Sequence, residues 1–341
     1  MKKNIISLCL LVISLVIWVS GCTSDKQEEQ KTSSKEAVIG VLLYKADDTY
    51  VSYVKEALER SLQGKADVTF YNADNEQFTQ DTQLIGLLEQ GVDALAINLV
   101  DVQAASFIVD SIKKTNIPVV FFNREPNAND LKLYSKAFFV GTTPQEAGQM
   151  QGEIIQRLWQ AHPELDRNQD GAFQYIMVQA NSDNPEALAR TETSVKTARE
   201  LGVPLKQIGS TFMCGWDEQR AYEATRHIMA HLVKSVELII SNNDAMALGV
   251  LRSLQEQGFN SGDESKYIPI IGVDATPEAL RAIEGGYMTA TVRQDSEAMG
   301  RTIATLLLNL VHNRPYLEGI ELDWDASGVG LRVPHSTIED D

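Results

Sequence analysis

The sequence predicts an α/β protein built from two doubly wound domains. From Ala37 onward, short apolar segments rich in Val, Ile and Phe alternate with longer segments of helical period. The apolar segments are continuous, which is typical of parallel strands covered by helices on both faces. Ten such segments are many for one open sheet, and 341 residues are enough for two domains, so two domains of similar size are expected.

The elements follow one another in regular order. The expected strands are 37–44, 67–72, 94–100, 117–123, 137–142, 173–180, 206–212, 236–243, 268–274 and 288–294. The expected helices are 50–63, 77–90, 103–115, 144–161, 185–201, 217–233, 244–257, 276–284 and 295–312. We expect the chain to cross between the domains near Gly141-Thr142 and Arg293-Gln294, since each pair follows a strand and precedes a helix.

The N-terminus has the pattern of a lipoprotein signal peptide, which we predict over 1–21. Lys2 and Lys3 precede an uncharged, mostly apolar run over 5–19, which is short for a membrane span. The run ends in Val19-Ser20-Gly21-Cys22, which resembles the bacterial lipobox and predicts lipidation of Cys22. The alternative is an uncleaved N-terminal anchor. Both interpretations place the rest of the chain outside the cytoplasmic membrane, at the periplasmic or cell-surface face.

Composition limits the remaining possibilities. Residues 22–36 are mostly polar with no apolar period, and they predict a flexible tether. The net charge of −17 argues against a general nucleic-acid binder, whose surface must be cationic. The three cysteines form neither a disulfide framework nor a four-cysteine zinc site. Without Cys9 and Cys22, Cys214 is the only thiol left, and we interpret it as inert packing.

Polar side chains follow many of the expected strands, at the edge where open α/β sheets bind ligands. Their planar polar groups suit hydroxyls, which both donate and accept hydrogen bonds. Two aromatic residues among them offer faces for the C–H surface of a pyranose, so a neutral sugar is the expected ligand. The alternative is that these residues only cap helices, but the same chemistry at seven strand ends favours a ligand. The set comprises Lys45, Asp47, Asp48, Tyr50, Asn123, Arg124, Glu125, Asn181, Asp183, Asn184, Glu186, Arg190, Trp216, Asp217, Asn242, Asn243, Asp244, Asp274 and Gln294.

Residues 166–174 follow the first positions of a calcium-binding EF-hand loop. Asp166, Asn168 and Asp170 supply oxygen ligands at positions 1, 3 and 5, and Gly171 permits the sharp turn at position 6. The Ala172 carbonyl and the Gln174 side chain would follow at positions 7 and 9. Position 12 is a methionine and a strand follows, so a remote carboxylate must complete the site. The alternative is a plain acidic turn.

Five segments in order resemble the periplasmic galactose/glucose-binding proteins of sugar ABC transporters. They are YKADDTY at 44–50, ALAINLVD at 94–101, PVVFFNREP at 118–126, NNDAMALG at 242–249 and GVDATPEAL at 272–280. The resemblance spans roughly 37–334. It implies the periplasmic binding protein type I fold, with two Rossmann-like lobes joined by three hinge segments and a sugar between them. The N-terminal lobe would comprise 37–142 plus 294–332, and the C-terminal lobe 143–293 plus 333–341.

The resemblance also implies residue roles. Sugar contacts would fall on Asp48, Asn123, Arg190, Asn243 and Asp274, with Tyr50 and Trp216 stacking on the ring. Structural Ca²⁺ would be held by Asp166, Asn168, Asp170, Ala172, Gln174 and, as the remote carboxylate, Glu237. The sequence departs from the family pattern at Asn184, Glu186 and Gln294, where the family has His, Asp and Asn, and at Tyr50, where it commonly has Phe. These changes concern which aldose is preferred.

The resemblance implies a non-enzymatic, monomeric protein that delivers a monosaccharide to an ABC transporter permease. A chemoreceptor is a further partner, and a membrane sensor kinase is the alternative one. A glycoside hydrolase would need a carboxyl of raised pKa beside a glycosidic bond, and no pairing in the sequence indicates it. A cytoplasmic repressor of the same fold would carry an N-terminal helix-turn-helix where this chain has a lipobox.

Overall fold

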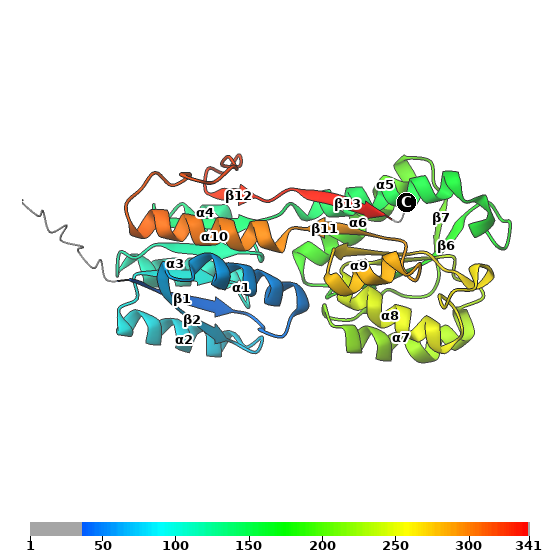
Figure 1. Ribbon diagram of the computed structural model, residues 1–341, viewed down its shortest axis with the longest axis horizontal. Helices are drawn as coiled ribbons and strands as arrows, with labels where there is room; N and C mark the ends of the chain where they lie inside the picture. The colour runs from blue at the N-terminus through cyan, green and yellow to red at the C-terminus, as the bar shows by residue number, and fades with distance from the viewer. Residues whose placement is uncertain (1–35, 340–341) are drawn as a thin grey trace, which may run out of the picture. The chain divides into compact units, whose positions relative to one another are not determined.

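The computed structural model describes residues 36–339, which form alternating strands and helices around two sheets (Figure 1). This architecture confirms the predicted α/β fold with two doubly wound lobes. The predicted signal peptide, Cys22 and nearly all of the predicted tether lie outside the described residues. Within 36–339, no helix is long and apolar enough to cross a membrane.

The first sheet has six parallel strands in the order β12-β5-β4-β3-β1-β2. The strands are β1 (Ala37–Leu43), β2 (Ala66–Asn72), β3 (Ala94–Ile97), β4 (Val119–Phe122), β5 (Ala137–Gly141) and β12 (Gly330–Arg332). One apolar cluster packs α1 (Thr49–Leu62) and α10 (Ser296–Val311) on one face. A second cluster packs α2 (Gln77–Gln90), α3 (Ala105–Lys113) and α4 (Ala128–Leu131) on the other. We call this body the N-terminal lobe.

The second sheet has the order β13-β11-β10-β9-β6-β7, and β8 also pairs with β6. Its strands are β6 (Phe173–Gln179), β7 (Leu205–Gln207), β8 (Phe212–Met213), β9 (Leu238–Ser241), β10 (Ile270–Asp274), β11 (Ala290–Gln294) and β13 (His335–Glu339). Helices α5 (Pro144–Ala161) and α6 (Pro185–Glu200) contribute to the apolar cluster on one face. Helices α7 (Glu218–Leu232), α8 (Asp244–Glu256) and α9 (Pro277–Glu284) contribute to the cluster on the other. We call this body the C-terminal lobe.

The chain passes between the sheets after β5, after β11 and between β12 and β13. The three passages lie beside one another. Arg332 donates from Nη1 to the Thr142 carbonyl at 3.0 Å, which joins the first passage to the third. Strand β13 pairs with β11, and this pairing places His335 opposite Gln294. A backbone movement at one passage would therefore alter hydrogen bonds made by the other two.

The strands differ from the prediction in three respects. The strand expected over 206–212 is two short strands, β7 and β8, because Gly209 turns the chain at a φ of +67° between them. The apolar pattern predicts parallel sheets, but β13 runs antiparallel to β11. Neither β12 nor β13 is among the expected strands, because each is short and finds its partner far away in the sequence.

Helices α5 and α6 approach closely because α5 presents glycines to α6. A Cβ atom on Gly148 would lie 2.8 Å from the Arg190 carbonyl oxygen. A Cβ atom on Gly152 would lie 2.6 Å from Cβ of Thr197. Neither distance is tolerated without movement of backbone, so these two glycines set the position of α6. The same helix carries Arg190, which is central to the site described next.

Candidate binding site between the two lobes

Side chains from both lobes meet in one pocket, which we call the inner pocket. All the predicted sugar-binding residues except Asn184 line it. They are Asp48, Tyr50, Asn123, Glu186, Arg190, Trp216, Asn243, Asp274 and Gln294. Asn184 instead lines a neighbouring pocket together with Asn123 and Arg124.

Three of the predicted residues also begin helices. Asp48 accepts from the Val51 amide at 3.0 Å and caps α1. Asn184 accepts from the Ala187 amide at 2.9 Å and caps α6. Asn243 accepts from Met246 at 3.0 Å and caps α8. Capping and pocket lining thus coexist at Asp48 and Asn243, because a side chain at a strand end can reach both the next helix and the pocket.

Arg190 is the centre of the inner pocket. Its side chain is only 3% exposed. Nη1 donates to the Asn242 carbonyl at 2.8 Å, and Nη2 donates to Glu186 at 2.6 Å and to Oε1 of Gln294 at 2.5 Å. Asp274 lies 4.0 Å from Nη1. Arg190 Nε and Gln294 Nε2 are buried without a hydrogen-bond partner, so donor capacity remains.

Burial governs the charge of the pocket carboxylates. Burial raises the pKa of Asp274, and the nearby Arg190 guanidinium opposes that rise. Burial also raises the pKa of Asp48, against hydrogen bonds from the Tyr44 hydroxyl and the Val51 amide. A ligand that donates hydroxyl protons to these carboxylates would stabilise their charged forms.

The backbone is strained where it enters the pocket. Asn123, Trp216 and Asp274 have positive φ angles of 61°, 66° and 123°. Asparagine tolerates this region, whereas Trp and Asp at these angles are uncommon. Strain of this kind persists only where the surroundings impose it, and it concentrates at binding sites. Here it turns the three side chains toward the inner pocket.

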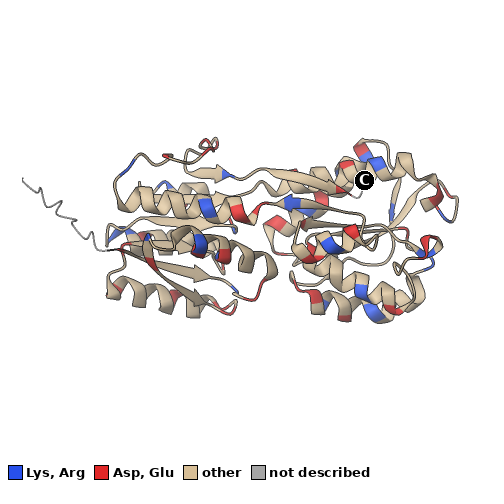
Figure 2. Ribbon diagram, in the orientation of Figure 1, with Lys and Arg blue, Asp and Glu red and all other residues tan. Residues whose placement is uncertain are grey.

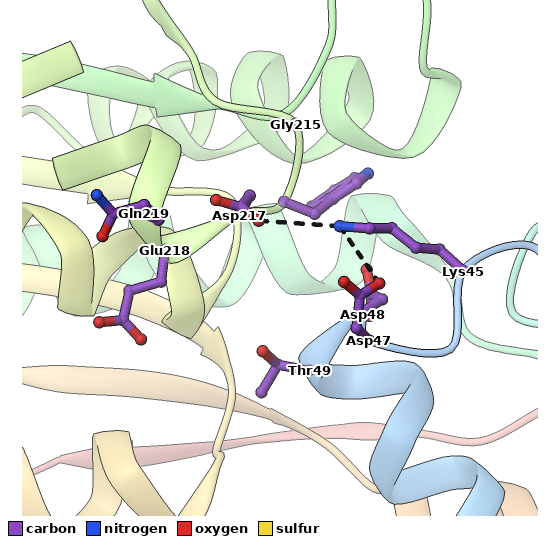
Figure 3. A pocket seen from close by; sticks show the side chains of 9 residues that line it. Lys45, Asp47, Asp48, Thr49, Gly215, Asp217, Glu218 and Gln219 are labelled. Carbon is purple, nitrogen blue, oxygen red and sulfur yellow. Dashed lines mark ion pairs between the residues drawn. The ribbon is translucent and has the colours of Figure 1, made fainter. Parts of the chain in front are cut away.

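An outer pocket of about 310 Å³ adjoins the inner one and shares Asp48 and Trp216 with it (Figure 3). Lys45 of the N-terminal lobe lies 3.8 Å from Asp217 of the C-terminal lobe and 3.5 Å from Asp47. Nearby, the Tyr53 hydroxyl on α1 donates to Glu278 on α9 at 2.7 Å. Polar contacts therefore join the lobes at the mouth of the site. Elsewhere, charges of both signs are intermixed along the helices and loops (Figure 2).

The structure adds residues that the sequence analysis does not single out. The Tyr44 hydroxyl donates to Asp48, and the Arg124 guanidinium stacks 3.9 Å from the centre of the Tyr44 ring. Asn98 donates to Oδ1 of Asn123 at 3.2 Å. Asn98 directly follows β3, so its place at a strand end is a usable signal. Tyr44 lies within an apolar segment, where an aromatic residue gives no such signal.

The loop 166–174 is hydrogen-bonded to Glu237, the residue expected as the remote calcium ligand. Oε1 of Glu237 accepts from the amides of Arg167 and Asn168 at 2.8 and 3.2 Å, and Oε2 accepts from the Gln174 amide at 3.1 Å. Glu237 is 2% exposed. Asp166 accepts from the Gly171 amide at 2.9 Å, which forms the tight turn.

Two side-chain contacts in the loop would have to break before a cation could bind. Lys206 lies 2.8 Å from Asp170, and the Asn168 amide donates to Gln174 at 2.8 Å. Among residues 36–339, no three His, Cys, Asp or Glu side chains are arranged to hold a metal ion. The carboxylates, amide oxygens and carbonyl of the loop match the chemistry of calcium, whereas the present side-chain contacts are those of a loop bonded to itself.

Comparison with known proteins assigns the class. Residues 39–315 match the model of the periplasmic binding protein domain. The chain is 36% identical over 307 residues to the D-galactose/methyl-galactoside binding periplasmic protein MglB of Haemophilus influenzae, covering 89% of each. It is 24% identical over 316 residues to the ribose import binding protein RbsB of Bacillus subtilis, covering 89% of this chain and 92% of the relative. A solute-binding protein of Bacillus halodurans solved with myo-inositol aligns with a TM-score of 0.73 at 21% identity, covering 91% and 96% of the two chains.

The chain thus belongs to the periplasmic binding protein family, as the resemblance indicates. Members of this family are non-enzymatic solute-binding proteins of ABC transporters that work outside the cytoplasmic membrane. The pocket between the lobes is consistent with this class, since its lining comes from both sheets.

Proposed function

We propose that the protein binds a monosaccharide of the glucose/galactose class in the inner pocket and delivers it to a sugar ABC transporter. The main support is that carboxylates, amides and one guanidinium from both lobes line a single pocket together with Tyr50 and Trp216. The similarity to MglB, whose name specifies D-galactose and methyl-galactoside, supports the same class.

The chemistry of the pocket suits a neutral polyol more than a charged metabolite. Asp48 and Asp274 accept hydroxyl protons, while Arg190 and Asn243 donate to hydroxyl oxygens. The lining has three carboxyl groups and one guanidinium, and burial raises the pKa of Asp48 and Asp274, so the pocket disfavours an anionic ligand and suits a neutral one. Tyr50 and Trp216 supply apolar area for the faces of the ring.

Calorimetry of the soluble fragment against D-galactose, D-glucose, D-ribose and D-xylose tests the proposal. We expect binding of at least one hexose in preference to the pentoses. Trp216→Ala should weaken that binding roughly tenfold or more, because a buried aromatic contributes through its large contact area. Trp159→Ala is the matched control, since Trp159 packs against Phe173 inside the C-terminal lobe. Failure to bind any of these sugars would contradict the assignment.

We further propose that the loop 166–174 and Glu237 hold a structural Ca²⁺ ion. Asp166, Asn168, Asp170, Ala172, Gln174 and a bidentate Glu237 supply about seven oxygens, within the range that calcium prefers. The ion would join two distant parts of one lobe. The loop lies outside the residues that line the inner pocket, so the ion would act on stability and leave sugar binding unchanged.

Thermal unfolding with EDTA and with added Ca²⁺ tests this second proposal. We expect EDTA to lower Tm, since an ion at a hundredfold excess over its Kd stabilises a fold by about 2.7 kcal/mol. Glu237→Gln should abolish the response to calcium, whereas Glu200→Gln, an exposed control on α6, should retain it. An unchanged melting curve under both conditions would leave the loop as an acidic turn.

We also propose that Cys22 carries the lipid that holds the protein at the membrane. The lipobox pattern before Cys22 supports this anchor. Fractionation of cells expressing Cys22→Ser tests it. We expect the variant to leave the membrane fraction while its sugar binding is preserved, because the substitution lies outside both lobes.

A further inference from the structure

A histidine lies at the passage from the N-terminal lobe to β13. His335 is the first residue of β13, and its side chain has no exposed surface. Nδ1 lies 3.0 Å from Oε2 of Glu146 near the start of α5. The other ring nitrogen, Nε2, is buried without a hydrogen-bond partner. Buried polar atoms are nearly always paired, so this nitrogen calls for a partner.

A matching group lies on the opposite strand. His335 is directly paired with Gln294 across β11 and β13, and side chains so paired lie on the same face with Cβ atoms about 5 Å apart. Gln294 accepts from Arg190 at Oε1, while its Nε2 is buried without a hydrogen bond, although the amide lies close enough to the Tyr50 hydroxyl to oppose the rise in the pKa of Tyr50. The two unpartnered atoms are complementary. An imidazole that donates from Nδ1 to Glu146 is an acceptor at Nε2, and the Gln294 amide nitrogen is a donor.

We propose that His335 is a positioning residue for the inner pocket. It accepts at Nε2 from the Gln294 amide, directly or through one water molecule, and so holds Oε1 of Gln294 toward Arg190. Glu146 fixes the tautomer from the other side. A chain of hydrogen bonds then runs from α5 through both strands to the guanidinium. The role of His335 in sugar binding rests on the function proposed above.

Protonation of His335 would break this chain. The ring faces Glu146 on α5, Arg190 on α6 and the uncharged Gln294 on β11, and Glu186 and Asp274 lie beyond Arg190. Burial lowers the pKa of His335 and Arg190 lowers it further, while Glu146 opposes both. A protonated ring donates at Nε2, so the Gln294 amide must turn and present its nitrogen to Arg190, where two donors would face each other. Sugar affinity should therefore fall as the pH drops through this lowered pKa, which lies below the usual value of about 6.5 for histidine.

Calorimetry from pH 5 to pH 8 with the preferred hexose tests the proposal. His335→Gln keeps a polar group near Nε2 but cannot be protonated, so its Kd should change less with pH than that of the parent protein. His335→Leu should weaken binding about fivefold at neutral pH, the value of one lost hydrogen bond. His162→Gln is the matched control, because His162 is an exposed histidine 2.9 Å from Glu164. Parent-like affinity and pH profiles in both His335 variants would overturn the proposal.

A second measurement separates this proposal from the function on which it rests. Long-range ¹H–¹⁵N spectra of the ligand-free protein report the tautomer of each histidine. We expect His335 to carry its proton on Nδ1 near neutral pH, with Nε2 as a hydrogen-bonded acceptor. A proton on Nε2 would overturn the proposal whether or not a sugar binds. A protein with the expected tautomer that binds no sugar would leave the hydrogen-bond chain intact and refute only the proposed ligand.

Discussion

The inner pocket and the loop 166–174 both gather carboxylate and amide side chains, but they differ in how these are satisfied. In the loop, the carboxylates of Asp166, Asp170 and Glu237 all accept from N–H groups of the chain itself. In the inner pocket, Arg190 Nε and Gln294 Nε2 are buried without partners, and the loop has one such donor, Arg167 Nε. The backbone has positive φ angles at Asn123, Trp216 and Asp274 in the pocket, and at Gln169 alone among the non-glycine residues of the loop.

The difference separates a cluster that stabilises itself from one that is organised for a ligand. A loop whose oxygens are already hydrogen-bonded gains stability from an ion but does not need one to fold. In the pocket, the surrounding fold holds strained residues and unpaired donors in place, which lowers the free energy of unfolding. A ligand that bonds to those donors recovers part of this free energy. Substitutions in the two regions should therefore affect different measurements.

The largest expected change in sugar affinity comes from substituting Arg190 in the pocket, with Arg167 in the loop as the comparison. Each donates to a backbone carbonyl at 2.8 Å, Arg190 in the pocket and Arg167 in the loop. Removing one member of a buried charged network costs about 2–5 kcal/mol, so Arg190→Ala should raise the sugar Kd roughly a hundredfold or more. Arg167→Ala should leave it within about twofold, since a distant site adds independently. Calorimetry checks both, and equal losses would erase the distinction between the regions.

Substitutions of one glycine in each region, Gly148 and Gly171, should have effects of intermediate size. Gly148→Ala would push a Cβ to within 2.8 Å of the Arg190 carbonyl, so α6 must shift. We expect about 1–3 kcal/mol of lost stability together with roughly tenfold weaker sugar binding, because Arg190 moves with the helix. Gly171→Ala meets no atom within 4 Å but has a φ of +77°, which costs about 1–2 kcal/mol in strain.

Chemical denaturation and calorimetry distinguish the two glycine variants. Gly171→Ala should lose stability and keep its sugar affinity. Gly86→Ala on α2 serves as a further control, because its Cβ would have only one neighbour, at 4.0 Å. A Gly148→Ala protein that binds sugar normally would show that α6 tolerates displacement without consequence for the pocket.

A smaller effect is expected from the contact between the lobes at Tyr53. Tyr53→Phe removes its hydrogen bond to Glu278, which joins the lobes only when they are close. One such bond is worth about 1 kcal/mol, so the sugar Kd should rise about fivefold or less. Tyr222→Phe removes a comparable bond to Glu256 within the C-terminal lobe and should leave the Kd unchanged. Titrations of both variants decide whether the bond supports closure.

The smallest effect is a pH dependence of opposite sign in the two regions. Lys206 and Gln174 lower the pKa of Asp170, so its stabilising contribution is present above about pH 4 and is lost as the pH falls through the lowered value. Burial raises the pKa of Asp48, so its contribution is present at acid pH and is lost as the pH rises.

Unfolding free energies from pH 3 to pH 7 check these signs. The stability of Asp170→Asn should fall below that of the parent protein as the pH rises. The stability of Asp48→Asn should improve relative to the parent over the same range. Parallel curves for the two variants would contradict the assigned directions.

Local signals in the sequence predict most of the fold. The expected helices 77–90 and 144–161 have the bounds that the structure has, because Gly91 ends one in the left-handed region and Pro144 begins the other. The strands β12 and β13 are missed since only the folded chain shows which distant strand they join. The single strand expected over 206–212 is wrong for a local reason, because Gly209 turns the chain between β7 and β8.

The sequence predicts which residues line the candidate site, but not which of them contact one another. Asp48, Asn243 and Asp274 can be predicted because they follow strands. In a parallel sheet the carboxyl ends of all strands lie at one edge, where ligands bind. The contacts of Tyr44 and His335 depend on which residue lies opposite, and no local pattern carries that information. The sugar and calcium roles remain predictions.

The interleaved path of the chain has a consequence for how the protein is made. The first sheet lacks its edge strand until residues 330–332 exist, and the second lacks β13 until residues 335–339 exist. Helix α10, which covers one face of the first sheet, is also made after most of the second. Domains that are continuous in sequence can fold one after the other during synthesis, but here neither lobe is complete before the last residues emerge. We therefore expect the nascent chain to stay unfolded until late, a state suited to threading through a narrow translocation channel.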